Sequence, residues 1–149
     1  LKHRKNVKVV FAEKDKKLIS QIKNNCQINA ISKKRYNVIQ SDIFSRVKGK
    51  YDYILANPPY IPIKKKRKLH KSVVNYEPKE ALFGGKDGLE YIEKFLVSTK
   101  NFLHPKGKVY MEFDSPQQKQ IEKLLKKLGY KSWKFHKDQY GKWRWVVIT

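Results

Sequence analysis

An apolar run that ends at two consecutive prolines constrains the fold more than any other part of the sequence. The run 51–56 has the length and residue types of a buried strand. Pro58 and Pro59 cannot continue a sheet ladder, and they prevent a helix from beginning at Asn57, so the chain must leave the sheet there. Ligands of open α/β sheets bind outside the carboxyl ends of the strands. The sequence therefore predicts a catalytic loop at 57–60.

The remaining pattern predicts a mostly parallel α/β sheet with one antiparallel strand. Helices are expected to begin at Asp15, Asp87 and Ser115, which are suitable N-cap residues. The last two strands are joined by only five residues, too few for a crossover helix, so they should form an antiparallel hairpin at the sheet's edge. Strands are expected at 7–12, 36–40, 51–56, 108–113, 130–136 and 142–149, and helices at 15–26, 87–103 and 115–128.

The chain carries 35 basic and 13 acidic residues, a formal charge of +22. This charge would attract RNA or a ribosome loosely. Lys outnumbers Arg 30 to 5, however, and this excess favours a compositional bias of solvated surfaces. The single cysteine, Cys26, excludes an internal disulfide and a cysteine zinc site. The histidines share no spacing typical of a metal site, so no metal is expected. No stretch is apolar and long enough to cross a membrane, and a cytoplasmic monomer is expected.

Acidic residues follow two of the expected strands. Glu13 ends the first, where a carboxylate commonly accepts hydrogen bonds from ribose hydroxyls. Asp42 follows the strand 36–40, and Phe44 lies two residues later, a pattern that can bind a purine through its amine and its ring face. The structural alternatives are a carboxylate that complements a helix dipole and a phenylalanine in the core. Together these residues indicate a nucleotide-like ligand.

The loop 57–60 can hold a planar NH2 group. The Asn57 side-chain oxygen and the Pro58 carbonyl are two acceptors for its two N–H bonds, which would leave the nitrogen lone pair free. The two prolines fix the direction of that carbonyl before binding, and Tyr60 can lie over the substrate plane. The alternative is an ordinary Pro-Pro turn with an Asn cap.

The motifs resemble those of the HemK/PrmC methyltransferases. The resemblance runs from about Val7 to Thr149 and rests on a series of short motifs. These are Asn57-Pro58-Pro59-Tyr60-Ile61-Pro62, Tyr76-Glu77-Pro78, Ala81-Leu82, Gly84-Gly85, Asp87-Gly88-Leu89, Leu103-x-x-x-Gly107, Glu112 with Gln117, and Asp138-x-x-Gly141-x-x-Arg144. It implies a Rossmann-like class I fold that transfers a methyl group from S-adenosylmethionine to the glutamine amide of a peptide chain release factor.

Residue roles follow from this resemblance. It implies cofactor binding by Glu13, Asp42, Ile43, Phe44 and Asn57, catalysis by Asn57, Pro58 and Tyr60, and substrate binding by Asn57, Pro58, Pro59, Tyr60, Glu77 and Pro78. Glu112, Gln117 and Arg144 also match family positions, and they are assigned to structure rather than to catalysis.

Two parts of the family pattern are absent from residues 1–149: the first strand with its glycine-rich cofactor motif, and the preceding helical domain. The sheet should therefore lack a central strand, and this methyltransferase domain alone should bind S-adenosylmethionine poorly or not at all. A glutamine of a ribosomal protein is a close alternative substrate. Two further hypotheses are an adenine-amine methyltransferase acting on RNA or DNA, favoured by the basic cluster 64–68, and an inactive remnant.

Overall fold

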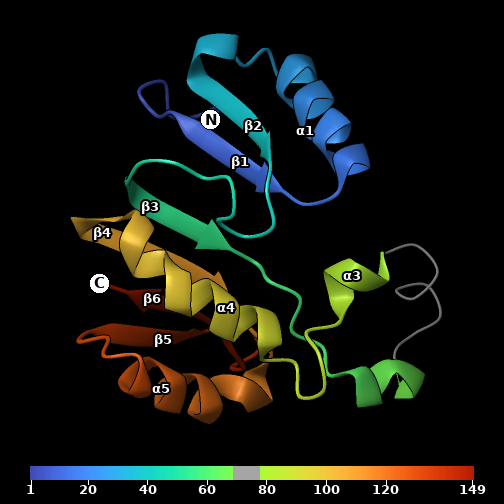
Figure 1. Cartoon of the computed structure of the whole chain (residues 1–149), viewed down its shortest axis with the longest axis vertical. Coiled ribbons are helices and arrows are strands. Elements are labelled where there is room, and N and C mark those ends of the chain that lie inside the picture. Colours follow the sequence, from blue (N-terminus) through green and yellow to red (C-terminus); the bar gives the residue numbers. More distant parts are fainter. Residues whose placement is uncertain (69–77) are drawn as a thin grey trace. The chain divides into compact units, whose positions relative to one another are not determined.

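The computed structural model describes residues 1–68 and 78–149, and the chain divides into two compact units, Leu1–Gly49 (unit 1) and Lys50–Thr149 (unit 2). Unit 1 is a strand-helix-strand arrangement, drawn in blue and cyan in Figure 1. Its elements are β1 (Val9–Glu13), α1 (Lys16–Ile28), the short 3-10 helix η1 (Lys33–Arg35) and β2 (Tyr36–Gln40).

The predicted elements of unit 1 are confirmed. Asp15 is the N-cap of α1, where its side chain accepts a hydrogen bond from the Lys17 amide at 2.8 Å. Cys26 is buried, on the face of α1 where the apolar period placed it. β1 and β2 pair in parallel with Glu13 opposite Gln40, so both strands end at the same edge.

Unit 2 is built on a four-stranded sheet in the order β3-β4-β6-β5. β3 and β4 are parallel, and β6 is antiparallel to both β4 and β5. The strands are β3 (Tyr51–Ala56), β4 (Leu103–Glu112), β5 (Trp133–Lys137) and β6 (Trp143–Ile148). The helices are α3 (Lys79–Leu82), α4 (Glu90–Thr99) and α5 (Gln118–Lys127), with the 3-10 helices η2 (Ile63–Lys68), η3 (Lys100–Phe102) and η4 (Ser115–Gln117).

The strands thus form two separate sheets. Within residues 1–68 and 78–149, no strand pairs with the second edge of β1 or of β3. The class expected from the sequence, a mostly parallel α/β fold with an antiparallel C-terminal hairpin, is confirmed.

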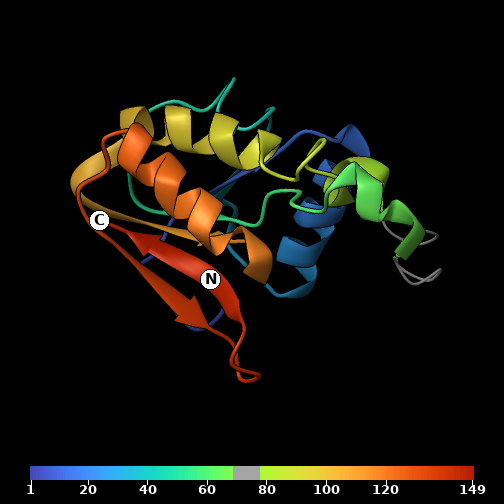
Figure 2. The ribbon, with the colours of Figure 1, turned by 90° about the horizontal axis from the view of Figure 1, so that it is seen from below.

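One face of the unit 2 sheet carries the core. α4 and α5 both lie on this face, as Figure 2 shows. Their apolar stripes face the inward side chains of β3, β4 and β6. Burial of such a stripe is the usual way in which an amphipathic helix is stabilised. The buried side chains are Ile92, Phe95 and Leu96 of α4, Ile121 and Leu125 of α5, Ile54 of β3, Val109 and Met111 of β4, and Val146 and Ile148 of β6.

The prediction that 51–56 is a buried strand is wrong for one of its faces. Tyr53 is 61% exposed and Leu55 is 77% exposed, and only Ile54 of this strand is buried. Apart from Asp52, the strand's residues are apolar on both faces, but the helices of unit 2 cover only one face. Tyr110 of β4, opposite Leu55 in the ladder, is also exposed.

Two predicted helix starts are shifted. Asp87 is not the N-cap of α4, which is Leu89, but the Asp87 side chain accepts a hydrogen bond from the Leu89 amide at 3.0 Å. Asp114, rather than Ser115, is the N-cap of the next helix, which opens with a 3-10 turn before α5. The N-cap thus lies two positions after the expected residue in the first case and one position before it in the second.

The predicted break at 104–107 is also wrong, because β4 already begins at Leu103. Tyr51 pairs with Leu103 and Tyr53 with Lys108, so β4 carries extra residues between two pairs of the ladder. Pro105 lies within this irregular stretch, where a missing amide donor costs no regular ladder bond.

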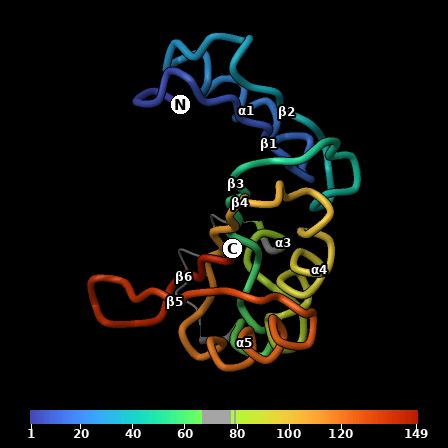
Figure 3. The backbone as a smooth tube through the Cα atoms, turned by 90° about the vertical axis from the view of Figure 1, so that its left-hand side faces the viewer, coloured from blue at the N-terminus to red at the C-terminus, as the bar shows by residue number. Residues whose placement is uncertain are grey.

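The C-terminal hairpin is confirmed, with β5 at the edge of the sheet. Its turn stands out from the rest of unit 2 in Figures 2 and 3. Asp138 organises the turn, since its side chain accepts hydrogen bonds from the amides of Tyr140 and Lys142 at 2.9 and 3.0 Å. In the part of the chain that the structure describes, no helix has the length and apolarity needed to span a membrane.

Tyr130, which is buried just beyond the end of α5, is expected to make unit 2 sensitive to alkaline pH. Its hydroxyl donates to the Leu96 carbonyl at 2.8 Å, and burial raises the pKa of this hydroxyl to about 12. Tyrosine in the unfolded chain ionises near pH 10. The protonated Tyr130 hydroxyl therefore stabilises the folded state fully below pH 10, and this stabilisation is lost as the pH rises from 10 to about 12.

We expect the free energy of unfolding to fall by roughly 2 kcal/mol more in the wild type than in Tyr130→Phe over that range. Urea unfolding at pH 9 and at pH 11.5 measures the difference, with the exposed Tyr140 replaced by Phe as the matched control. Equal pH dependence in the wild type and in Tyr130→Phe would contradict the assignment.

Candidate functional site

The loop 57–60 leaves the carboxyl end of β3, in the green part of Figure 1. Asn57 is exposed, while Pro58, Pro59 and Tyr60 are half-buried. Within residues 1–68 and 78–149, neither the Asn57 side chain nor the Pro58 carbonyl has a hydrogen-bond partner. Two acceptors on a partly buried, proline-stiffened loop are thus available to a ligand.

The Tyr60 side chain is fixed by Glu112. Its hydroxyl donates to Glu112 Oε1 at 3.2 Å, at the carboxyl end of β4. Burial raises the pKa of the Tyr60 hydroxyl above its ordinary value, and the nearby Glu112 carboxylate raises this pKa further. Tyr60 therefore stays protonated at neutral pH and remains a donor to Glu112, so it is not a general base for neutral-pH chemistry.

The residues that follow the loop are bonded to a second segment, 82–85. The Ile61 amide donates to the Leu82 carbonyl, the Gly84 amide to the Ile61 carbonyl and the Ile63 amide to the Gly85 carbonyl, each at 3.0 Å. Ile61 and Phe83 form a parallel bridge. These hydrogen bonds fix the backbone conformation of the residues that follow the 57–60 loop.

Gly84 of this segment and the nearby Gly88 lie close to the backbone carbonyls of Pro59 and Tyr60. A Cβ on Gly84 would stand 2.3 Å from the Pro59 oxygen, and a Cβ on Gly88 would stand 2.1 Å from the Tyr60 oxygen. Gly88 also has a φ of +83°, a conformation that side chains disfavour. The Gly-Gly and Gly-Leu motifs therefore permit a backbone approach that larger residues would block.

In unit 1, the acidic residues lie at the ends of the paired strands. Glu13 ends β1, and the Ser41 amide donates to the Glu13 carbonyl at 2.9 Å. Glu13 Oε1 accepts a hydrogen bond from the Asp15 amide at 2.8 Å. The exposed Asp42 forms an ion pair with Lys14 at 3.0 Å. Such exposed pairs contribute little, so Lys14 would compete only weakly with a ligand for Asp42.

The residues 41–44 form a tight loop beyond β2. The Ser41 hydroxyl is 3.1 Å from the Ile43 carbonyl and accepts from the Arg46 amide at 3.0 Å. Ile43 has a φ of +53°, which is rare for a β-branched residue, and such outliers gather at functional sites. Phe44 is half-buried beside it. This hydrogen-bonded loop carries three of the predicted cofactor residues.

The last two residues predicted to bind the substrate are Glu77 and Pro78. Glu77 lies outside the described residues. Pro78 is exposed and precedes α3.

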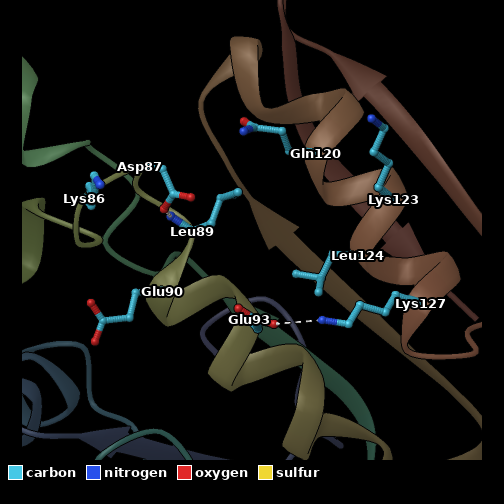
Figure 4. A pocket seen from close by; sticks show the side chains of 9 residues that line it. All are labelled: Lys86, Asp87, Leu89, Glu90, Glu93, Gln120, Lys123, Leu124 and Lys127. Atoms are coloured by element: carbon cyan, nitrogen blue, oxygen red, sulfur yellow. Dashed lines mark hydrogen bonds and ion pairs between the residues drawn. The ribbon is translucent and has the colours of Figure 1, made fainter.

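A groove between α4 and α5 contains none of the predicted site residues. Figure 4 shows the groove, with Lys127 directed at Glu93 across it at 3.9 Å. Its walls carry charges of both signs, from Lys86, Asp87, Leu89, Glu90, Glu93, Gln120, Lys123, Leu124 and Lys127.

The sequence did not indicate that Glu112 and Gln117 contact the loop. Glu112 follows Met111, which pairs with Ala56, so it lies next to the start of the loop. Because Glu112 lies at the carboxyl end of a parallel strand, where ligands of α/β sheets bind, its position could have indicated a place near the site. Gln117 contacts the Tyr60 carbonyl across 57 positions of sequence, and no local pattern predicts such a bond.

Comparisons with known proteins agree with this architecture. A bifunctional methyltransferase of Rickettsia conorii is 30% identical over 145 residues, covering 97% of this chain and 28% of that protein. A release factor glutamine methyltransferase of Lactococcus lactis is 30% identical over 146 residues, covering 97% of this chain and 53% of its own length. A solved methyltransferase structure from Pyrococcus furiosus matches with a TM-score of 0.68 and 27% identity, over 96% of this chain and 62% of that one.

This chain therefore spans between about a quarter and about half of the length of these curated relatives. The match to the Lactococcus protein confirms the resemblance drawn from the motifs. Residues 1–86 match the family model described as methyltransferase small domain, which is more than half of the chain. The chain therefore belongs to the methyltransferase small domain family.

Proposed function

We propose that this chain is part of an S-adenosylmethionine-dependent methyltransferase that acts on the side-chain amide of a glutamine in a peptide chain release factor. The observation that carries the proposal is the pair of unpartnered acceptors, the Asn57 side chain and the Pro58 carbonyl, at the carboxyl end of β3 in the described chain. The name of the Lactococcus relative supports the substrate.

The two acceptors suit a primary amide. An amide nitrogen has two N–H bonds and a delocalised lone pair, so it is a poor nucleophile unless its developing positive charge is stabilised. Asn57 and Pro58 would each accept one N–H bond, and this orients the nitrogen and stabilises that charge. Tyr60 would pack beside the amide while its hydroxyl remains on Glu112.

Unit 1 has residues that fit the proposed cofactor. The Glu13 carboxylate, at the end of β1, would accept hydrogen bonds from the ribose hydroxyls. Asp42, Ile43 and Phe44 would surround the adenine, with the exposed Asp42 carboxylate accepting from its amine. When bound, S-adenosylmethionine supplies an electrophilic methyl group on a sulfonium.

An assay with two substrates tests the proposal. The full-length protein is incubated with radiolabelled S-adenosylmethionine and either a release factor or total RNA. We expect label in the release factor. Because release factors act where translation ends, we propose that the enzyme works in the cytoplasm. Label confined to RNA would instead support the adenine-amine hypothesis, which the basic cluster 64–68 favours.

Glu13→Gln should weaken cofactor binding about tenfold, because a neutral amide accepts a weaker hydrogen bond than a carboxylate does. Calorimetric titration of the full-length protein with S-adenosylmethionine measures this change. Glu122→Gln, a carboxylate change on α5, is the control and should leave the affinity unchanged. An unaltered affinity in Glu13→Gln would remove Glu13 from the cofactor site.

A further inference from the structure

The side-chain amide of Gln117 joins three segments of unit 2. Its Oε1 accepts from the Asp114 amide at 3.0 Å, and its Nε2 donates to the Tyr60 carbonyl at 3.0 Å and to the Asp87 carbonyl at 3.4 Å. The side chain is buried, with 4% of the residue exposed. These partners fix the orientation of the amide, because only the nitrogen can donate to the two carbonyls.

Helix capping accounts for only one of these bonds. The bond from the Asp114 amide completes a capping box at the start of η4, and a glutamate would serve there equally well. The two Nε2 bonds reach residues 57 and 30 positions away. A buried amide that uses both of its donors on distant carbonyls holds those segments together.

The Tyr60 carbonyl lies two residues beyond the Pro58 carbonyl. The ring of Pro59 fixes one of the intervening torsions, and the contact of the Pro59 carbonyl with Gly84 limits the next. The bond from Gln117 then restrains the peptide plane of Tyr60. Little freedom is left in the backbone that directs the Pro58 carbonyl.

We infer that Gln117 is a positioning residue, which acts through the Tyr60 carbonyl to aim the Pro58 carbonyl and Asn57 at the nucleophile. This inference rests on the proposed function, in which those two acceptors hold a glutamine amide. A misplacement of about 1 Å in such a group can lower the rate about 10²-fold.

Gln117→Glu separates positioning from capping. The carboxylate keeps an acceptor for the Asp114 amide, but it has no donor for the carbonyls of Tyr60 and Asp87. In the full-length protein we expect kcat for methylation of a release factor to fall about 10²-fold. The dissociation constant of S-adenosylmethionine should stay within about twofold, because Gln117 lies outside the proposed cofactor residues. Gln120→Glu, an exposed position of α5, is the matched control.

Amide hydrogen exchange gives a readout that does not depend on activity. The amides of Ile61 and Gly84 should exchange at least about tenfold faster in Gln117→Glu than in Gln120→Glu, because their bonds lie next to the lost restraint. If Gln117→Glu fails to fold, Gln117→Met, which is uncharged and similar in volume, replaces it. Methionine also removes the acceptor for the Asp114 amide, so faster exchange at Ile61 and Gly84 is then compared with exchange at the Asp114 amide.

A lower kcat together with faster exchange supports the inference. An unchanged kcat, unchanged exchange, or an equal loss of cofactor affinity overturns it. If the wild-type protein transfers no methyl group to a release factor, the proposed function fails, and the exchange data alone decide whether Gln117 restrains the loop.

Discussion

Asn57→Ala is expected to lower kcat/KM for methylation of a release factor by about 10² to 10³-fold, the usual cost of removing one preorganised group that stabilises charge in a transition state. The Asn57 side chain is exposed and has no partner in the described chain, so its loss should cost little stability. The affinity for S-adenosylmethionine should change by less than about threefold, because its other proposed contacts lie at Glu13 and 42–44.

Steady-state kinetics and calorimetric titration of the full-length protein measure the two effects of Asn57→Ala. Asn101→Ala, an exposed asparagine in η3, is the matched control and should behave like the wild type. An Asn57→Ala variant that keeps more than about a tenth of the activity would show that Asn57 does not hold the nucleophile.

Gly84→Ala should have the second largest effect, a loss of about 10²-fold in methyl transfer. The added Cβ would stand 2.3 Å from the Pro59 oxygen and 2.7 Å from the Gly88 oxygen, both backbone atoms. The chain must therefore shift, and the shift falls on the peptide next to Pro58. Overpacking of this kind also costs about 1–3 kcal/mol of stability.

Gly141→Ala separates the two consequences of such a change. Gly141 has a φ of +74°, and a Cβ there would meet no atom within 4 Å, so alanine costs roughly 1 kcal/mol by strain alone. Thermal unfolding should show both variants to be destabilised, while only Gly84→Ala loses methyl transfer. Equal activity in the two variants would mean that the approach of Gly84 to the loop is not needed.

Local patterns were sufficient for most elements. The strands at 36–40 and 51–56 have the ends expected of them, because β-branched and aromatic runs there are bounded by polar or proline-containing turns. The hairpin followed from the short connection between its strands. Leu103 was assigned to the end of a helix because Pro105 indicates a break before the next strand. In the structure Leu103 begins β4, whose irregular ladder accommodates Pro105.

The parts that depend on distant contacts could not be predicted. Apart from Asp52, the side chains of 51–56 are apolar on both faces of the strand, so the sequence does not tell which face a helix covers. Leu55 proved to be exposed. Asn57 and Pro58 could be proposed from the sequence because their two acceptors are local to the loop, and their role stays a prediction. The contacts of Glu112 and Gln117 with Tyr60 arise only when the ends of β3 and β4 and the start of α5 come together.

Mapping the methylated atom tests the central claim most directly. The full-length protein is incubated with S-adenosylmethionine and a release factor, and the digested product is sequenced by tandem mass spectrometry. The claim that Asn57 and Pro58 hold a planar amide predicts one added methyl group on the side-chain nitrogen of a glutamine, and none when that glutamine is replaced by glutamate. Methylation of a lysine, of a carboxylate or of an RNA base alone would contradict it.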